Sequence, residues 1–564
     1  MKILFNHVGY EPADRKILLI EAPVDIAWRE LALVSLPDGA VVWRGEAQFA
    51  GAVEGWSVGP WWRVDVSEIR TPGRYALRWA TAEASGQSEG FEIAPGLLGQ
   101  GLVSDLLYYF KSQRSSGVFD IADRTARRVG DGAIRDVHGG WFDASGDTSK
   151  YLSHLSYANC MNPQQTPLVV WVLARAWQLY RAAGAPEYFL GRIRDEALHG
   201  ADFLVRMQDP EGFWHVTLFD KWTKDPAQRE LCSYRTQQGH KGADYQAGWR
   251  QGGGMAAAAL ALASTLGDGA DFRASDYLAC ARRGFDHLVE HGLSYLDDGK
   301  ENIIDDTCAL LAAVELHDVA HDPGFAAFTE SRAMKLMSRC RETNGRVWLA
   351  ADADGDRSWF HASDAGLPVV ALLRFADAQA TNTLAAGARA LAVDLVRSQL
   401  ALGASRSNPF SYPPHWVKLP GADGRFQWFY PHENPSGYWW QGENARLGSL
   451  ASAALGAAAA GGGTELRDAA HGWISWILGA NPFDRCMLHG RGRNNPVYMP
   501  PYDNAPGGVC NGITSGFDDE NDIAFAPDPQ ASDPLQNWRW GEQWLPHAAW
   551  LLHALALRET GGMA

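Results

Sequence analysis

The stretch Gly139–Asp147 (GGWFDASGD) places two carboxylates, Asp143 and Asp147, four residues apart in a run rich in glycine and serine. Such a run is a poor helix interior, so we expect a loop in which both side chains point into one small volume. Trp141 and Phe142 precede the first carboxylate. Paired carboxylates beside aromatic rings suit chemistry on sugars, where a carboxylate activates a water and the rings stack on sugar faces. The alternative is a loop of Asx turns that caps the next helix.

Length and composition bound the class of protein. At 564 residues the chain is longer than a single hydrophobic core usually supports, so we expect two domains. The net charge of −16 argues against nucleic-acid binding through a basic surface. The seven cysteines form no close metal-ligand pair, which favours free thiols in a reducing compartment.

The first seven residues run directly into strand-like sequence, without the apolar segment of a signal peptide. No stretch of the sequence approaches the ~20 apolar residues that span a bilayer. We therefore expect a cytoplasmic protein with neither a membrane nor a nucleic-acid partner. The sequence predicts no oligomeric state.

Residues 1–95 have the pattern of a β domain. Short apolar runs such as Leu31–Leu36 and Tyr75–Trp79 are separated by turn signals, among them Pro37-Asp38-Gly39 and Thr71-Pro72-Gly73. Strands at this spacing, with no helical pattern between them, predict a small β-sandwich that ends near residue 95.

Residues 96–564 have the pattern of a helical domain. Apolar residues recur at helical spacing, and several segments carry Ala and Leu on more than one face, as in helices packed on two sides. The expected helices are 101–113, 166–183, 187–208, 252–266, 274–292, 303–318, 323–343, 363–376, 382–401, 443–461, 464–478 and 542–558. Twelve helices with few strands suit an α/α barrel of six hairpins, and long polar connections such as 402–442 and 479–541 are candidates for function.

Five segments, in this order, resemble glycoside hydrolase family 9, the family of many inverting cellulases. They are LLYYFKSQR (106–114), GGWFDASGD (139–147), ADFLVRMQDP (201–210), WILGANPFDRCMLHGRGR (476–493) and GITSGFDDEND followed by NWRWGE (512–522 and 537–542). The resemblance implies a mainly α fold: an (α/α)6 barrel over 96–564, preceded by a small immunoglobulin-like β-sandwich over 1–95.

The resemblance also implies catalytic roles. Glu542 corresponds to the general acid that protonates the glycosidic oxygen, Asp147 to the general base that deprotonates water, and Asp143 to the carboxylate that holds this water. Tryptophans near Glu542 are expected to give the apolar surroundings that raise the pKa of an acid. The alternative for Glu542 is a carboxylate in the first turn of its helix, favoured by the helix dipole.

The sequence departs from the family pattern in three places. The turn from Asp143 to Asp147 has one extra residue, and the His-His-Arg element that grips substrate in endo-cellulases has no counterpart after Asn494-Asn495-Pro496. The calcium-binding element Asp-Val-Ala-Ala-Glu is replaced by Gly252-Gly253-Gly254-Met255-Ala256. We therefore expect no required cofactor and assign no metal ligand. The alternative location for a calcium site is the acidic residues Asp305, Asp306 and Asp518–Glu520.

The segments Ser156–Pro167, Thr236–Gly252 and Glu433–Asn444 resemble an exo-acting branch of the family, its glucosidases and exo-β-glucosaminidases. Polar and aromatic side chains suited to grip a terminal sugar are Trp141, Asp244, Tyr245, Trp439, Trp440, Glu443 and Trp538. Asp143 or Glu443 is a candidate partner for a 2-ammonium group, and Glu443 is also the reserve candidate for the acid.

The sequence thus predicts a glycoside hydrolase whose partner is an oligosaccharide substrate. The leading hypothesis is an inverting exo-β-1,4-glycosidase, of the exo-β-D-glucosaminidase or β-glucosidase type. It would release monosaccharide from the non-reducing end of chitosan- or cello-oligosaccharides. The alternatives are an endo-β-1,4-glucanase and a non-catalytic carbohydrate-binding protein.

Overall fold

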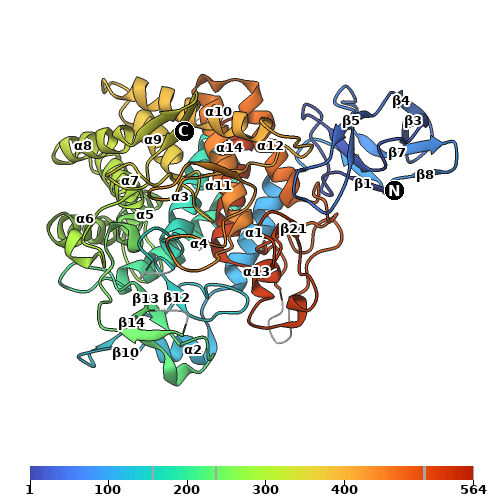
Figure 1. Ribbon diagram of the computed structural model, residues 1–564. Coiled ribbons are helices and arrows are strands. Elements are labelled where there is room, and N and C mark those ends of the chain that lie inside the picture. The colour runs from blue at the N-terminus through green and yellow to red at the C-terminus, as the bar shows by residue number, and fades with distance from the viewer. Residues whose placement is uncertain (155–157, 236–237, 499–503, 563–564) are drawn as a thin grey trace.

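The computed structural model describes residues 1–154, 158–235, 238–498 and 504–562 (Figure 1). Parts of the predicted sugar-binding segments 156–167 and 236–252 therefore lie outside the described residues. A small β domain lies at one side of a larger helical domain (Figure 1).

The N-terminal domain consists of two antiparallel sheets. One sheet has the order β1 (Lys2–Leu4), β2 (Ile17–Glu21), β6 (Trp61–Asp65), β5 (Gln48–Gly51). The other has the order β4 (Val41–Arg44), β3 (Trp28–Ser35), β7 (Gly73–Thr81), β8 (Ser85–Gln87), and β9 (Phe91–Ile93) also pairs with β7. Alternate residues such as Leu18, Ile20, Leu33 and Leu77 are fully buried in one apolar cluster that joins the sheets. The predicted β-sandwich is confirmed.

Six inner helices form a closed ring in the second domain. They are α3 (Thr166–Ala182), α5 (Gly254–Ala263), α7 (Ile303–Ala320), α9 (Leu367–Ala378), α11 (Glu443–Ala457) and α14 (Leu545–Thr560). Each contacts the next along the chain, and α14 contacts α3 to close the ring. All ten residues of α5 are buried, because neighbours surround it on every side.

Six outer helices cover this ring. They are α1 (Gln100–Ser112), α4 (Glu187–Arg206), α6 (Ala274–His291), α8 (Gly324–Ser338), α10 (Ala385–Ala404) and α12 (Thr464–Ile477). Each packs on an inner helix next to it in the sequence, except α1, which packs on α14 from the other end of the chain. The predicted (α/α)6 barrel is confirmed. The domain boundary at residue 95 stays a prediction, with β9 ending at Ile93 and α1 beginning at Gln100.

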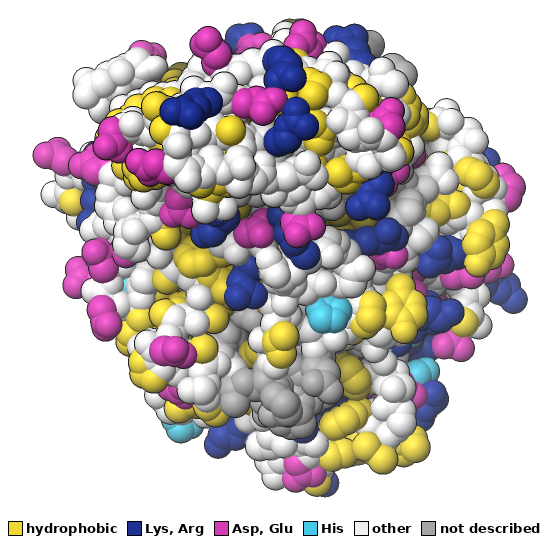
Figure 2. Space-filling view, turned by 90° about the vertical axis from the view of Figure 1, so that its right-hand side faces the viewer, with side chains coloured by type: hydrophobic (Ala, Val, Ile, Leu, Met, Phe, Trp, Pro, Cys, Tyr) yellow, Lys and Arg dark blue, Asp and Glu magenta, His cyan; other side chains and the backbone are white. Residues whose placement is uncertain are grey.

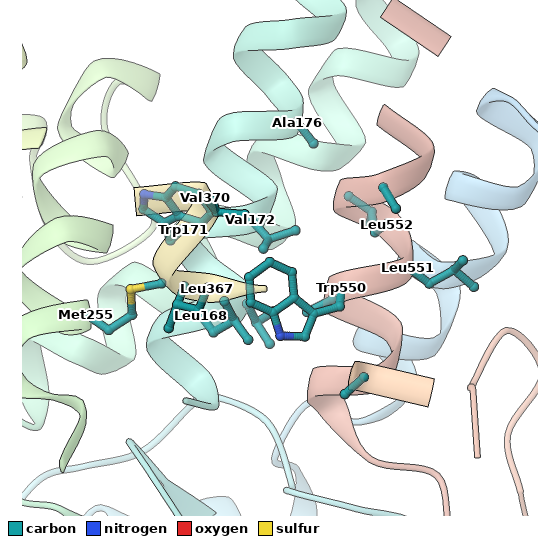
Figure 3. Close-up of a cluster of buried hydrophobic side chains, with 14 of the residues drawn as sticks. Leu168, Trp171, Val172, Ala176, Met255, Leu367, Val370, Trp550, Leu551 and Leu552 are labelled. Carbon is teal, nitrogen blue, oxygen red and sulfur yellow. The ribbon is translucent and has the colours of Figure 1, made fainter. Parts of the chain in front are cut away.

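Apolar side chains fill the barrel axis, so the barrel is a packed core. Leu168, Met255, Leu367 and Trp550, from four inner helices, belong to one buried cluster there (Figure 3). The β-sandwich joins the same cluster through Trp56 and Trp61.

Short strands and helices shape the connections between barrel helices. One sheet has the order β11 (Ile134–Arg135), β10 (Ala126–Arg128), β14 (Glu230–Arg235), β13 (Thr217–Phe219), β12 (Lys150–Tyr151), with β15 (His240–Gly242) on β14. Three hairpins follow, β16–β17 (Cys340–Thr343, Arg346–Leu349), β18–β19 (His415–Val417, Arg425–Gln427) and β20–β21 (Thr514–Ser515, Ile523–Ala524). Two short helices are α2 (Gly117–Asp123) and α13 (Trp538–Gly541).

Several helix ends differ from the sequence prediction by a few residues, and two of these differences have a clear local cause. The helix expected at 323–343 ends at Ser338, because Asn344 (φ +51°) and Gly345 (φ +75°) form the turn of the β16–β17 hairpin. The helix expected at 542–558 begins at Leu545, with Pro546 in its first turn. Glu542 therefore lies on extended backbone before α14 and is not a first-turn carboxylate.

Within the described part of the chain, no helix combines the length and the apolar character needed to cross a bilayer. On the face shown in Figure 2, acidic side chains are spread among basic, apolar and uncharged ones.

Candidate active site

One cavity of about 590 Å³ contains the three predicted catalytic carboxylates, Asp143, Asp147 and Glu542. It lies at the end of the barrel where the inner helices begin. Four of its lining residues stand just before inner helices: Pro163 before α3, Ser363 before α9, Gln441 before α11 and Trp544 before α14. The ring of inner helices thus forms the platform on which the site is built.

The loop that carries the two aspartates makes a tight turn. The Ala144 N–H donates to the Asp147 carbonyl at 3.3 Å, and the Asp147 N–H donates to the Ala144 carbonyl at 3.2 Å. Ser145 fastens this turn to the C-terminal segment: its N–H donates to the Gln543 carbonyl at 2.9 Å and its Oγ accepts from the Gln543 N–H at 3.0 Å. The turn is thereby held beside Glu542, the residue before Gln543.

Gly146 lets the Glu542 carboxylate approach the turn closely. A Cβ on Gly146 would lie 2.5 Å from Glu542 Oε1, closer than any side chain tolerates. The backbone of Gly146 also hydrogen-bonds to the Glu542 carboxylate. A side chain at this position would push the Glu542 carboxylate away from the turn, so the glycine favours this close approach.

Glu542 and Asp147 have pKa values that are split by their surroundings. Burial, together with the neighbouring charge of Asp147, raises the pKa of Glu542 to about 8. Burial and the charge of Asp220 raise the pKa of Asp147 to about 6. Hydrogen bonds from Tyr151 Oη at 2.7 Å and the Ser149 N–H at 2.8 Å stabilise the ionised form of Asp147. At neutral pH, Glu542 holds a proton while Asp147 is ionised, which is the pairing of an acid with a base.

Asp143 lies beside this pair, and its carboxylate accepts a hydrogen bond from Trp544. The Trp544 Nε1–H group is 3.1 Å from both carboxylate oxygens of Asp143. Burial, together with the charges of Asp147 and Glu542, holds the pKa of Asp143 well above its usual range. His154 Nδ1 is 3.8 Å from Asp143 Oδ2, and burial lowers the pKa of this histidine to about 3, so the ring is neutral.

The predicted sugar-binding tryptophans fall into two groups. Trp440 and Trp538 line the cavity. Trp141 is fully buried beneath the aspartate loop, where its Nε1–H donates to Glu196 Oε1 at 2.7 Å. Trp439 is 8% exposed and packs against Trp540 and the His432 ring. Trp141 and Trp439 support the walls and do not line the cavity.

Three further predicted residues also lie outside the cavity. Asp244 is exposed beside β15, where it pairs with Arg235. Tyr245 packs beneath the Arg128 guanidinium, which lies 5.0 Å from its ring centre. Both residues directly follow β15, which pairs with β14.

Glu443 is buried at the start of α11, 2.7 Å from Arg446, and accepts a hydrogen bond from Tyr412 Oη. The ion pair with Arg446 fits a structural role. In this position Glu443 reaches neither a sugar in the cavity nor the reacting bond, so we drop it as a sugar contact and as the reserve acid.

Several cavity residues were missed by the sequence analysis. They are Trp222, Tyr498 and Asn511, together with Tyr438 and Gln441, which lie in the predicted sugar-binding segment Glu433–Asn444 but were not singled out there. Each comes from a long connection of mixed composition, and no spacing rule distinguishes it from its neighbours. Lys224, near Trp222, is half-buried, and its charge partly offsets the raised pKa of Glu542.

Two of the candidate calcium ligands, Asp305 and Asp306, are engaged with arginines. Asp305 is 3.0 Å from Arg250, and Asp306 is 2.7 Å from Arg339, with all four side chains buried. Among the described residues, no group of three or more His, Cys, Asp or Glu side chains is arranged to hold a metal ion. The residues present do not fit the calcium site that the family resemblance implies.

The sequence profile of Glycosyl hydrolase family 9 matches residues 100–501, a range that includes the aspartate loop and ends before Glu542. No curated protein matches the sequence.

Solved structures match over the whole chain. A metagenome-derived glycoside hydrolase family 9 endoglucanase is 20% identical, with a TM-score of 0.70 over 100% of this chain and 99% of that one. A family 9 protein of Bacteroides ovatus is 18% identical, with a TM-score of 0.67 over 100% and 99%. A thermostable endoglucanase from Alicyclobacillus acidocaldarius is 18% identical, with a TM-score of 0.65 over 99% of each chain. These similarities show the fold, and the profile match over most of the chain shows that it belongs to glycosyl hydrolase family 9.

Proposed function

We propose that the protein is an inverting exo-β-1,4-glycosidase that removes single sugars from the non-reducing end of short oligosaccharides. The observation that carries this proposal is the pair of buried carboxylates, with pKa values of about 6 and about 8, facing one cavity. A base that is ionised and an acid that is protonated at the same pH are what a single-displacement hydrolysis needs.

The chemistry then requires no other group. Ionised Asp147 accepts a proton from a water as the water oxygen bonds to the anomeric carbon. Glu542 donates its proton to the glycosidic oxygen as the bond from this oxygen to the anomeric carbon breaks. Asp143 orients the water, and Trp544 orients Asp143. Proton exchange with solvent restores both carboxyl groups, and the released sugar has inverted configuration.

The size of the cavity favours exo action on short substrates. A volume of about 590 Å³ falls among sites that enclose one small molecule, about the size of a disaccharide. Aromatic side chains from three connections line it: Trp222, Tyr438 with Trp440, and Trp538. These rings suit stacking on pyranose faces, with Gln441 and Asn511 available for hydroxyl groups.

The charges around the cavity favour an uncharged sugar. A 2-ammonium group would need an ionised partner, but burial disfavours ionisation of Asp143, and Lys224 adds a positive charge near Glu542. We therefore place cello-oligosaccharides before chitosan oligosaccharides. The second candidate function is an endo-β-1,4-glucanase, the activity named for two of the similar solved structures.

A product profile separates these candidates. Cellotetraose and chitosan tetramer are digested side by side, with the Glu542→Gln enzyme as the control for contaminating activity. Glucose and cellotriose in equal amounts as the early products from cellotetraose support the proposal, and faster release from chitosan would reverse the sugar preference. Cellobiose as the main early product, with little glucose, would favour the endoglucanase. A lack of products from both substrates would contradict the proposed specificity.

A further inference from the structure

Arg250 is enclosed at the rim of the barrel, in the turn Trp249–Gly253 that leads into α5, and its side chain is fully buried. Nη1 donates to the Lys300 carbonyl and to Asp305 Oδ2, both at 3.0 Å. Nη2 donates to Asn159 Oδ1 at 2.6 Å and to Asp298 Oδ1 at 2.8 Å. One guanidinium thus binds four oxygens from two parts of the chain, Asn159 and the segment 298–305.

These four oxygens have the chemistry of a hard-cation site. Two carboxylates, a side-chain amide oxygen and a backbone carbonyl are the ligand types that Ca²⁺ takes in proteins. Asp305 is held further by the Arg250 backbone N–H at 3.1 Å and the Asn302 N–H at 2.8 Å. The positive charge that these oxygens surround is the guanidinium of Arg250 and not a metal ion.

The neighbouring backbone leaves no place for the calcium-binding element of the family. The corresponding residues, Gly252-Gly253-Gly254-Met255-Ala256, have no side-chain oxygen. A Cβ on Gly252 (φ +98°) would lie 2.5 Å from Leu152 Cβ, and a Cβ on Gly254 would lie 2.9 Å from Cys308 Cβ. A carboxylate at either position would displace these neighbours.

We propose that the Arg250 guanidinium is the permanent structural cation of this corner of the barrel and that the protein takes no calcium there. The guanidinium links Asn159 to the segment that leads into α7. Met161 and Pro163, shortly after Asn159, line the catalytic cavity. Arg250 is therefore a positioning residue for a wall of the site, and this inference does not depend on which sugar the protein takes.

Thermal unfolding of the full chain tests the first half of this inference. The wild-type protein is measured in EDTA and in about 10 mM CaCl₂, with MgCl₂ at the same concentration as the ionic-strength control. Because the guanidinium already occupies the oxygens, we expect Tm to be equal in all three to within about 1 °C. A Tm that rises with Ca²⁺ but not with Mg²⁺, or that falls in EDTA, would overturn the proposal.

The Arg250→Ala variant tests the second half. Removing the guanidinium leaves Asp298 and Asp305 without their cation, so we expect Tm to fall by about 5 °C or more in EDTA. The emptied oxygens are then open to Ca²⁺, which we expect to restore part of the loss.

Arg332→Ala is the matched control for this variant. It also removes an arginine that binds two carboxylates, Glu301 and Asp306, although the Arg332 side chain is 13% exposed. Those carboxylates keep other partners, since Lys335 binds both and Arg339 binds Asp306. We expect a lower Tm for this control with no gain from Ca²⁺. An Arg250→Ala protein with the wild-type Tm, or with a Ca²⁺ response no larger than that of the control, would overturn the proposal.

The Arg250→Lys variant provides a second test if the alanine variant does not fold. An ammonium keeps the charge but cannot span the oxygens from Asn159 to Asp305 as the two-pronged guanidinium does. We expect a Tm below that of the wild type and no response to Ca²⁺. A Tm equal to that of the wild type would contradict the linking role assigned to the guanidinium.

Discussion

Two groups of buried carboxylates lie near the same end of the barrel, and their surroundings are opposite. Asp305 and Asp306, at the start of α7, are fully buried, and each is bound by a buried arginine, Arg250 or Arg339. Removing Arg250 would leave Asp305 without its cation, whereas Asp306 would keep Arg332 and Lys335 if Arg339 were removed. This group holds the barrel together.

The catalytic group, Asp143, Asp147 and Glu542, is bound by uncharged donors: an indole, a hydroxyl and backbone N–H groups. Neutral donors only partly offset the cost of burying a charge, so all three pKa values are raised. The difference between the groups is the difference between structural and chemical use of a buried carboxylate. The carboxylates of the first group are paired with arginines, whereas those of the second face uncharged donors and can gain or lose a proton near neutral pH.

The largest expected effect comes from Glu542→Gln. Because the variant cannot donate a proton, we expect turnover of a β-1,4-linked oligosaccharide to fall by about 10³-fold. Tm should not fall, since no buried cation loses its partner. Steady-state kinetics and thermal unfolding on the same preparation check both statements. Retained turnover, or a Tm loss of several degrees, would place Glu542 in the structural group.

Asp306→Asn is the opposite case. The change leaves Arg339 and Arg332 short of a negative partner, so we expect the free energy of unfolding to fall by about 3 kcal/mol. Turnover by the folded fraction should stay within about twofold of the wild type, since Asp306 is bound to arginines and not to the cavity. Denaturant unfolding and active-site-normalised kinetics measure the two quantities. An Asp306→Asn protein that keeps its stability but has lost turnover would contradict the distinction between the structural and the catalytic carboxylates.

The pH dependence of kcat/KM is expected to have two limbs. Activity should rise as Asp147 loses its proton, with a pKa of about 6. It should fall as Glu542 loses its proton, with a pKa of about 8, which places the optimum near the midpoint. Initial rates across this range in a constant-ionic-strength buffer give both values. If the acid limb gave the ordinary pKa of an aspartate, burial would not raise the pKa of Asp147 as described.

The smallest expected effect is that of Trp544→Phe. The ring is kept but the N–H donor to Asp143 is lost, so we expect kcat to fall about tenfold, with KM changing less. Trp540→Phe is the matched control, because the buried Trp540 Nε1 has no hydrogen-bond partner within the described structure. Equal losses in the two variants would attribute the effect to ring packing and not to the hydrogen bond.

The sequence predicts the scaffold better than the site. Helical periodicity with Ala and Leu on several faces indicated the inner helices, and the turn signals indicated the β-sandwich, because both patterns are local. The Asn344-Gly345 turn was as local a signal, and it was missed when the helical pattern was extended through it. Pro546 likewise marked the true start of α14.

The site depends on contacts between distant segments, which no local pattern encodes. The motifs located Asp143 and Glu542 by resemblance, but the N–H of Trp544 on Asp143 joins residues 401 positions apart. Trp440 lines the cavity while its neighbour Trp439 is packed behind it, and side-chain type alone does not separate them.

The most direct test of the contrast between Glu542 and Asp147 compares substrates that differ in their leaving group. Glu542→Gln and Asp147→Asn are assayed on cellobiose and on dinitrophenyl β-glucoside, whose phenolate leaves without a proton. On the dinitrophenyl substrate we expect the turnover of Glu542→Gln to return to within about tenfold of the wild type, because this leaving group needs no acid. We expect Asp147→Asn to stay inactive, because it still lacks the base that activates the water. Equal impairment of Glu542→Gln on both substrates would contradict its role as the acid.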